Sequence, residues 1–155
     1  MDKLTPEEKI TNEETRQHIR YVAKNLHIIV KHLLDRADNH DKSKLSSPEV
    51  EIFTQVTANL SKLTYGSEEY EKQLADMKPA LDHHYANNRH HSSHFRHGVK
   101  DMNLVDIIEM FCDWQAAGKR HADGNLRKSI EVNAKKYNIS PQLVSIFENS
   151  MELFE

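Results

Sequence analysis

The chain has 155 residues and a formal net charge of −3 with histidine neutral; hydrophobic residues make up 37% of it and charged residues 29%. These values suit one globular domain with its own core, and the acidic balance gives no broad basic surface for nucleic acid. No apolar run approaches the length of a membrane helix, and the first residues lack the apolar segment of a signal peptide. We therefore expect a cytoplasmic protein, in a bacterium or a phage-infected host, with no membrane partner.

The first predicted helix follows a polar, flexible N-terminus over residues 1–11, and residues 12–155 are expected to form a single domain. From Asn12 onwards the apolar side chains recur at helical spacing. This apolar stripe comprises Ile19, Val22, Leu26, Ile29 and Leu33. His18 lies on the same stripe, where a hydrogen-bonded core histidine is the alternative to a metal ligand. The pattern stops at residues 35–39, so the helix is expected to end there.

A capping pattern opens the second predicted helix: Ser46 is followed by a proline in the first turn and by Glu49 three residues later. A break next to Ser67 should end this helix, and Ser67 itself should cap the third. Pro79 should kink or restart the third helix near its middle, because proline cannot donate the backbone hydrogen bond. His84 continues the apolar face of that helix, so its imidazole is expected to point inward.

The helix that Asn103 should cap carries two different faces. Its expected core face comprises Leu104, Ile107, Ile108, Phe111 and Trp114. A second stripe carries Asp106, Glu109 and Asp113, and such an acidic stripe is usually a solvent face. Here the apolar neighbours of Asp113 leave little polar surface, and a buried carboxylate needs a cation or a metal. Cys112, the one cysteine, excludes an internal disulfide and is expected to be a small buried hydrophobe.

Two further helices are predicted after Asn125 and after Ser140, each of which is a good cap residue. No alternating strand pattern occurs along the chain, so we predict an all-α fold: a compact single-domain bundle of about six helices. The last helix is more apolar than a solvated chain end requires. Its apolar residues include Phe147, Met151, Leu153 and Phe154. They either pack on the domain or form a homodimer contact.

Histidine is concentrated in residues 82–97, which hold six of the chain's eleven histidines. Neutral imidazole is the commonest metal ligand in proteins, although a solvated histidine-rich loop is the alternative. The adjacent pair His40-Asp41 can place a nitrogen and an oxygen on one metal. Mixed nitrogen and oxygen ligation suits Mn, Fe, Co, Ni or Zn without selecting among them. We therefore expect a divalent transition metal as cofactor, as one ion or two.

The order of these residues resembles the HD-domain superfamily of metal-dependent phosphohydrolases, which is all-helical. The residues that carry the resemblance are His18, His40, Asp41, His84, His91 and Asp113. The segments 40–45, 83–95 and 109–116 resemble more closely a family of small, uncharacterised phage and bacterial proteins. Together the resemblance covers about residues 18–118. It implies an HD-like domain that hydrolyses a phosphoester in a small, nucleotide-like substrate.

The resemblance also implies roles for single residues. The implied ligands of a first metal are His40, Asp41 and Asp113, with His18 completing the set. Those of a second metal, or of the substrate phosphate, are His84 and His91. The residues implied to orient or neutralise the phosphate are Lys44, Asn88, Arg89 and His90. Glu109, one turn before Asp113, is implied to order the attacking water or to support the ligands.

The assignment of His18 depends on the shape of the first helix. His18 lies 22 residues before His40, which is about 33 Å along a straight helix. His18 can therefore be a ligand only if the helix breaks, and no glycine or proline marks a break. If the helix is straight, His32 is the better candidate.

Two other functions are open at this stage. One is a non-catalytic module of phage or bacterial origin that binds a metal or engages a host factor. The other is a nucleic-acid-binding protein, which the acidic net charge makes the least favoured. Its contact residues would be Arg89, Arg96, Lys100, Arg120 and Arg127.

Overall fold

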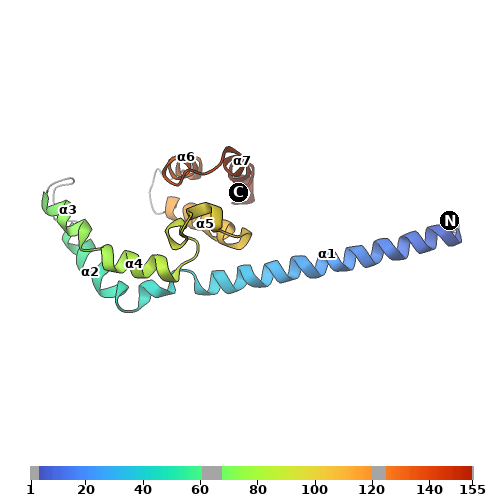
Figure 1. The fold of residues 1–155 in the computed structure, drawn as a ribbon, viewed down its shortest axis with the longest axis horizontal. Helices are drawn as coiled ribbons and strands as arrows, with labels where there is room; N and C mark the ends of the chain where they lie inside the picture. Colours follow the sequence, from blue (N-terminus) through green and yellow to red (C-terminus); the bar gives the residue numbers. More distant parts are fainter. Residues whose placement is uncertain (1–3, 61–67, 120–124, 155) are drawn as a thin grey trace. The chain divides into compact units, whose positions relative to one another are not determined.

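The computed structural model describes residues 4–60, 68–119 and 125–154 of the chain, and every regular element in them is helical (Figure 1). The α-helices are α1 (Pro6–Asn39), α2 (Glu49–Leu60), α3 (Glu68–Ala75), α4 (Lys78–Asn87), α5 (Leu104–Gly118), α6 (Leu126–Lys136) and α7 (Pro141–Asn149). Four short 3-10 helices accompany them: η1 (Lys42–Leu45), η2 (Ser92–His94), η3 (Gly98–Asp101) and η4 (Met151–Phe154). The prediction of an all-α fold is confirmed. The chain divides into two units, residues 1–38 and 39–155.

Helix α1 begins at Pro6, six residues before the expected start at Asn12. The hydroxyl of Thr5 accepts the backbone N–H of Glu8 at 3.2 Å, and the Glu8 carboxylate accepts the N–H of Thr5 at 2.7 Å. This reciprocal pair is a capping box, and proline suits the first position of a helix. The polar composition of the N-terminal residues therefore conceals a well-capped helix start.

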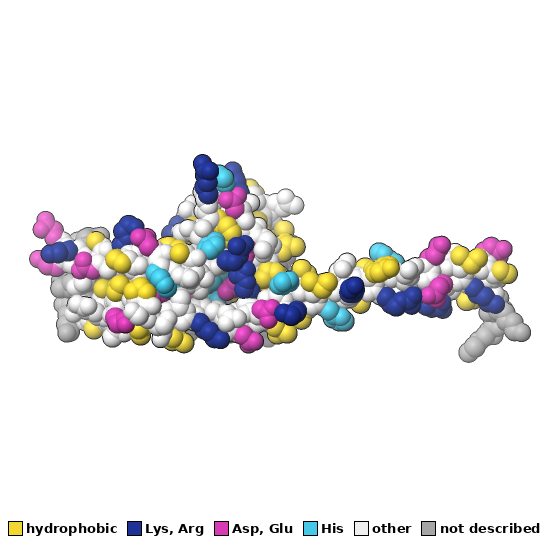
Figure 2. All heavy atoms as spheres, turned by 60° about the horizontal axis from the view of Figure 1, so that its bottom comes forward, with side chains coloured by type: hydrophobic (Ala, Val, Ile, Leu, Met, Phe, Trp, Pro, Cys, Tyr) yellow, Lys and Arg dark blue, Asp and Glu magenta, His cyan; other side chains and the backbone are white. Residues whose placement is uncertain are grey.

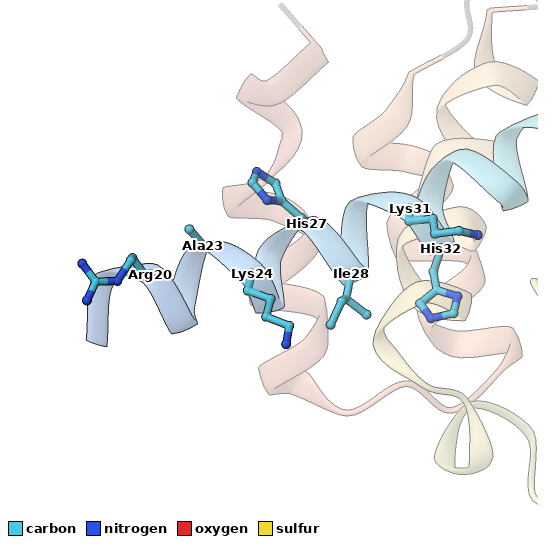
Figure 3. Close-up of a pocket in the computed structure, with 7 residues that line it drawn as sticks. All are labelled: Arg20, Ala23, Lys24, His27, Ile28, Lys31 and His32. Carbon is cyan, nitrogen blue, oxygen red and sulfur yellow. The ribbon is translucent and has the colours of Figure 1, made fainter. Parts of the chain in front are cut away.

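Helix α1 continues without interruption for 34 residues, and none of them is buried. Its apolar stripe is exposed: Ile19 and Leu26 are 59% and 60% accessible, and Figure 2 shows hydrophobic side chains among charged ones along this helix. Figure 3 shows a surface hollow of about 480 Å³ on the same helix, whose lining includes Arg20, Lys24 and Lys31. Among the described residues, no helix combines the length and apolar content that a membrane crossing requires.

The unit of residues 39–155 contains two groups of helices, which Figure 1 shows in turquoise to yellow-green and in gold to dark red. Helices α2, α3 and α4 pack with η1, and helices α5, α6 and α7 pack with one another. The second group holds the main core. Its buried members are Met110, Phe111, Trp114, Leu126, Ile130, Ile139 and Phe147. Phe147 of α7 stacks on Phe111 at 5.0 Å between ring centroids and meets Trp114 edge-on at 5.4 Å.

Two details of the helix predictions need correction. On α5, Leu104 and Ile108 were expected in the core but are 74% and 39% exposed, and Cys112 is exposed as well. The helix buries Phe111 and Trp114 in the core and turns its carboxylates toward the histidines, so these three side chains lie outside. The predicted restart at Pro79 is confirmed, because α3 ends at Ala75 and α4 begins at Lys78 with the proline in its first turn. The break predicted next to Ser67 lies outside the described residues.

An ion pair between a half-exposed arginine and a buried aspartate joins the histidine-rich loop to α5. Arg89 donates from Nε and Nη2 to the two oxygens of Asp106, at 3.0 and 2.9 Å. Asp106 has no exposed surface, and its carboxylate also accepts the N–H of Asn103 at 3.0 Å, which completes a capping box at the start of α5. The Arg89 guanidinium lies over the ring of Phe95, 4.8 Å from its centroid. Arg89 therefore holds the loop that carries His90 in a fixed place.

This arrangement predicts a large stability effect at Asp106. The substitution Asp106→Asn removes the buried charge that pairs with Arg89, so we expect the free energy of unfolding to fall by about 2 kcal/mol or more. Chemical denaturation followed by circular dichroism measures it. The control is Asp82→Asn, which breaks the exposed pair with Lys78 on α4 and should cost less than about 0.5 kcal/mol. Equal effects of the two substitutions would contradict this role of Asp106.

Candidate metal centre

Seven side chains with metal-ligating groups gather where η1, α4, the loop after α4 and α5 meet. They form three overlapping groups, and the ligand atoms of each group lie within 4.8 Å of one another. The first group is Asp41, His84, His90 and His91; the second is His40, His90 and Glu109; the third is His40, Asp41 and Asp113. All seven residues belong to the unit of residues 39–155.

Local backbone structure brings these residues together. Asp41, directly after the end of α1, has φ 55° and ψ 13°. This left-handed conformation is one that aspartate adopts more readily than most non-glycine residues. His84 lies on the buried face of α4, as its sequence spacing predicts. Glu109 and Asp113 are four residues apart on α5, so both carboxylates project from one face of that helix.

The first group has the spacing of a metal coordination shell. Nε2 of His84 lies 2.9 Å from Nε2 of His91 and 3.4 Å from Oδ1 of Asp41. Nε2 of His90 lies 3.5 Å from the same oxygen. Neighbouring ligands around an ion with bonds of about 2.1 Å are separated by about 3.0 Å in an octahedron and about 3.4 Å in a tetrahedron. These atoms can therefore bind one ion with little movement.

The third group lies on the other side of the Asp41 carboxylate. Nε2 of His40 is 3.7 Å from Oδ2 of Asp41 and 3.7 Å from Oδ1 of Asp113. Lys44 also contacts Oδ2 of Asp41, at 2.6 Å. Because Asp41 faces the two groups with different oxygens, the seven residues can hold either one ion or two ions that share Asp41.

Two carboxylates outside the first group orient the imidazoles. Oε1 of Glu109 lies 2.9 Å from Nδ1 of His40 and 3.2 Å from Nδ1 of His90. Glu49, which has no exposed surface, places its oxygens 2.7 and 2.8 Å from Nδ1 of His83 and of His84. A histidine that donates its Nδ1–H to a carboxylate keeps a lone pair on Nε2. The ring of His84 thus directs a lone pair from Nε2 toward Asp41.

Some buried polar atoms at this point lack the partners that buried atoms normally have. Nδ1 of His90 is buried and forms no hydrogen bond within the described part of the chain, although Oε1 of Glu109 lies 3.2 Å away. Oδ1 of Asp41 and Nε2 of His90 are also buried, and neither of them forms a hydrogen bond there. Leaving a buried donor or acceptor unsatisfied costs about 1–3 kcal/mol, and more for a charged group. Both atoms belong to the first group, and a cation there would satisfy both. The donor set therefore fits a metal ion by chemistry as well as by distance.

The charges around the histidines also favour a cation. The carboxylates of Asp113 and Glu109 raise the pKa of His40 to about 10, so His40 carries a proton at neutral pH. Burial, with the neighbouring His90 and His84, lowers the pKa of His91 to about 4. His91 is consequently neutral and can offer Nε2 to a metal. A divalent ion can take the place of the His40 proton as the positive charge among these carboxylates.

Most of the sequence-predicted site residues are brought together here. They are His40, Asp41, His84, His90, His91, Glu109 and Asp113. Asn88 is buried and donates to Ser43 Oγ at 2.7 Å and to the carbonyl of His84 at 2.8 Å, so it supports the histidines rather than facing a ligand. Arg89 is engaged by Asp106. The catalytic roles given to Asn88 and Lys44 stay predictions.

The two histidines considered on the first helix are placed differently. His18 and His32 lie on α1 with exposed side chains, and no group of potential ligands among the described residues includes either of them. The helix is continuous from Pro6 to Asn39, so it lacks the break that His18 would need. Their roles as ligands stay predictions.

Sequence reasoning missed Glu49. Its position three residues after Ser46 suggested a capping glutamate, but its carboxylate instead contacts His83 and His84 across 34 and 35 residues of sequence. A signal was available, because His83 and His84 are adjacent histidines on a helix that must pack against another. Nothing in the sequence indicated which carboxylate would receive them.

A cavity of about 200 Å³ adjoins the cluster, between α5, α6 and the histidine loop. Its lining comprises His90, His91, Ser92, Met110, Asp113, Trp114, Asn133 and Tyr137. Three of these residues belong to the groups of potential ligands. An ion at the cluster would therefore be reachable from this cavity by a small molecule.

The orienting role of Glu49 can be tested by metal binding. The substitution Glu49→Gln keeps the size of the side chain. The glutamine has one acceptor oxygen, so it cannot use two oxygens to accept hydrogen bonds from His83 and His84, as the carboxylate does. We expect the affinity for Mn²⁺ or Co²⁺ to fall by about 10–100-fold, measured by competition with a chromophoric chelator. Glu51→Gln, an exposed change on the same helix, should bind like the wild type. An unchanged affinity in Glu49→Gln would show that Glu49 does not orient the ligands.

Comparisons with known proteins identify the chain only at the level of its family. No curated protein and no solved structure matches it significantly. A family model matches residues 7–153, which include every residue of the candidate centre. The chain therefore belongs to the family described as a family of unknown function, DUF5662.

Proposed function

We propose that this protein is a metal-dependent phosphohydrolase that cleaves a phosphoester bond in a nucleotide or oligonucleotide through an activated water. The observation that carries the proposal is the position of the ligand cluster at the wall of a cavity. His90, His91 and Asp113 belong both to the ligand groups and to the cavity lining. A catalytic metal needs such access, whereas a structural metal is closed off by its ligands.

A divalent ion at this cluster would lower the pKa of water and neutralise phosphate oxygens. The protein's own side chains have complementary tasks. Glu109 and Glu49 hold the imidazoles with Nε2 facing the ion. Asp113, which lines the cavity, is placed to take a proton from the attacking water. The water oxygen would form the new bond to phosphorus while the ester P–O bond breaks, and the leaving oxygen would take up the proton that Asp113 accepted from the water.

Two further points support hydrolysis. The order His40-Asp41, His84, His91, Asp113 resembles the HD-domain phosphohydrolases, and these are the residues that gather in the cluster. The ligands are nitrogen and oxygen atoms alone, which suits Mn, Fe, Co, Ni or Zn at a site for phosphate chemistry. Lys44, at 2.6 Å from Asp41, is 40% exposed and can also meet a phosphate oxygen.

The alternative is a metal that only stabilises the fold of an interaction module. The near-complete burial of His84 and His90, which are 2% and 1% exposed, favours this reading for the first ligand group. Dimerisation through the C-terminal segment is a related proposal. Phe147 is buried in the core, whereas the side chain of Leu153 is 78% exposed and could contact a second copy of the chain. A structural metal predicts that chelation lowers the melting temperature and that no turnover exists to be lost.

The deciding experiment combines metal content with turnover. Protein purified without a tag and loaded with Mn²⁺, Co²⁺, Ni²⁺ or Zn²⁺ is assayed on bis(p-nitrophenyl) phosphate and on a panel of nucleotides and short oligonucleotides. We expect one or two bound ions and turnover with at least one metal, and Asp41→Asn should lose both. Asp82→Asn, on the exposed face of α4, is the matched control and should behave like the wild type.

The possible outcomes separate the two functions. Stoichiometric metal without turnover on the whole panel would overturn the phosphohydrolase and leave the structural metal. No metal in the wild type would overturn both.

A further inference from the structure

The cavity beside the metal centre has a second wall with its own chemistry. Helix α6 contributes Asn133 and its C-cap residue Tyr137, which lie four residues apart and both line the cavity. Both side chains line the cavity, so the amide and the hydroxyl can meet a ligand there. Both residues are partly buried. This wall had no assigned role in the sequence analysis.

The lining distinguishes a charged end from a neutral one. Asp113, His90 and His91 mark the end that adjoins the metal ligands. No lysine or arginine of the described chain lines the cavity. Lys136 lies outside this lining, with its Nζ over the ring of Tyr137 at 5.0 Å from the centroid, so this cation engages the face of the phenol and not its hydroxyl. An amide and a phenol instead suit neutral polar groups such as hydroxyls, because each can both donate and accept a hydrogen bond.

The remaining walls and the size limit what can enter. Met110 and Trp114 supply apolar surface from α5, which suits the face of a ring. The volume of about 200 Å³ is below the range of about 300–1,000 Å³ for pockets that enclose drug-sized ligands. The cavity can therefore enclose only part of a nucleotide, such as its sugar ring.

We propose that Asn133 and Tyr137 bind the neutral polyhydroxylated group, a sugar ring, that carries the phosphate in the substrate of this centre. The phosphate lies at the metal ligands, the ring lies against Met110 and Trp114, and its hydroxyls contact the α6 wall. The inference rests on the proposed function, since it assumes that the metal centre binds a phosphate. Asn133 and Tyr137 would thus select which group attached to the phosphate can bind.

The test compares two ligands that cannot be hydrolysed. One is methylphosphonate, and the other is the analogue of ribose 5-phosphate in which a methylene group replaces the ester oxygen. Both are titrated calorimetrically into metal-loaded wild type, Asn133→Ala and Tyr137→Phe. We expect the sugar phosphonate to bind more tightly to the wild type, and each substitution to weaken it by about three- to tenfold. Methylphosphonate affinity and metal content should not change.

Two control substitutions test the specificity of the effect. Asn149→Ala and Tyr21→Phe change exposed residues on α7 and α1 and should leave both affinities unchanged. Equal binding of the two phosphonates, or sugar phosphonate binding that both α6 variants keep, would overturn this inference while the proposed function stands. If neither phosphonate binds to the metal-loaded protein, the phosphate site itself is absent and the proposed function fails as well.

Discussion

The need to pair buried carboxylates organises the described part of the unit of residues 39–155. Glu49 and Asp106 have no exposed surface, and a buried carboxylate without a partner would cost several kcal/mol. Arg89 pairs with Asp106 and so ties the histidine loop to α5. His83 and His84 pair with Glu49 and tie α4 to α2. These contacts involve His84, a member of the first ligand group, and Arg89, the neighbour of His90, so they fix the backbone that carries the metal ligands.

The same pairing decides which atoms the centre offers. Glu49 lies beside Nδ1 of His84, so Nε2 of His84 faces Asp41 as an acceptor. Acceptor nitrogens 2.9–3.5 Å from one another or from a carboxylate oxygen repel each other unless a proton or a cation lies between them. An ion would relieve that repulsion and also satisfy the buried oxygen of Asp41. The orientation of the rings, the negative charge of the carboxylates and the unsatisfied buried atoms therefore all favour a bound cation.

Helical periodicity was enough to predict the all-α fold, because apolar residues recur at the spacing of about 3.6 residues in the long segments of the sequence. Residue chemistry drew attention to the pair His40-Asp41 and to the inward positions of His84 and Asp113, while His91 entered the set only through the resemblance to the HD-domain superfamily. Other features depend on tertiary contacts that spacing does not encode. Glu49 looked like a helix cap because its partners lie 34 and 35 residues away. Leu104 and Ile108 were predicted to lie in the core because they are apolar. The sequence of α5 does not reveal which of its faces packs on the core and which faces solvent.

The most direct test of the metal centre is an anomalous-scattering map. Crystals of protein loaded with Co²⁺ or Mn²⁺ are measured above and below the absorption edge of that metal. The account predicts a peak between the Nε2 atoms of His84, His90 and His91 and Oδ1 of Asp41, with metal–nitrogen distances of about 2.0–2.2 Å. A peak confined to exposed histidines such as His97, or no peak at all, would contradict it.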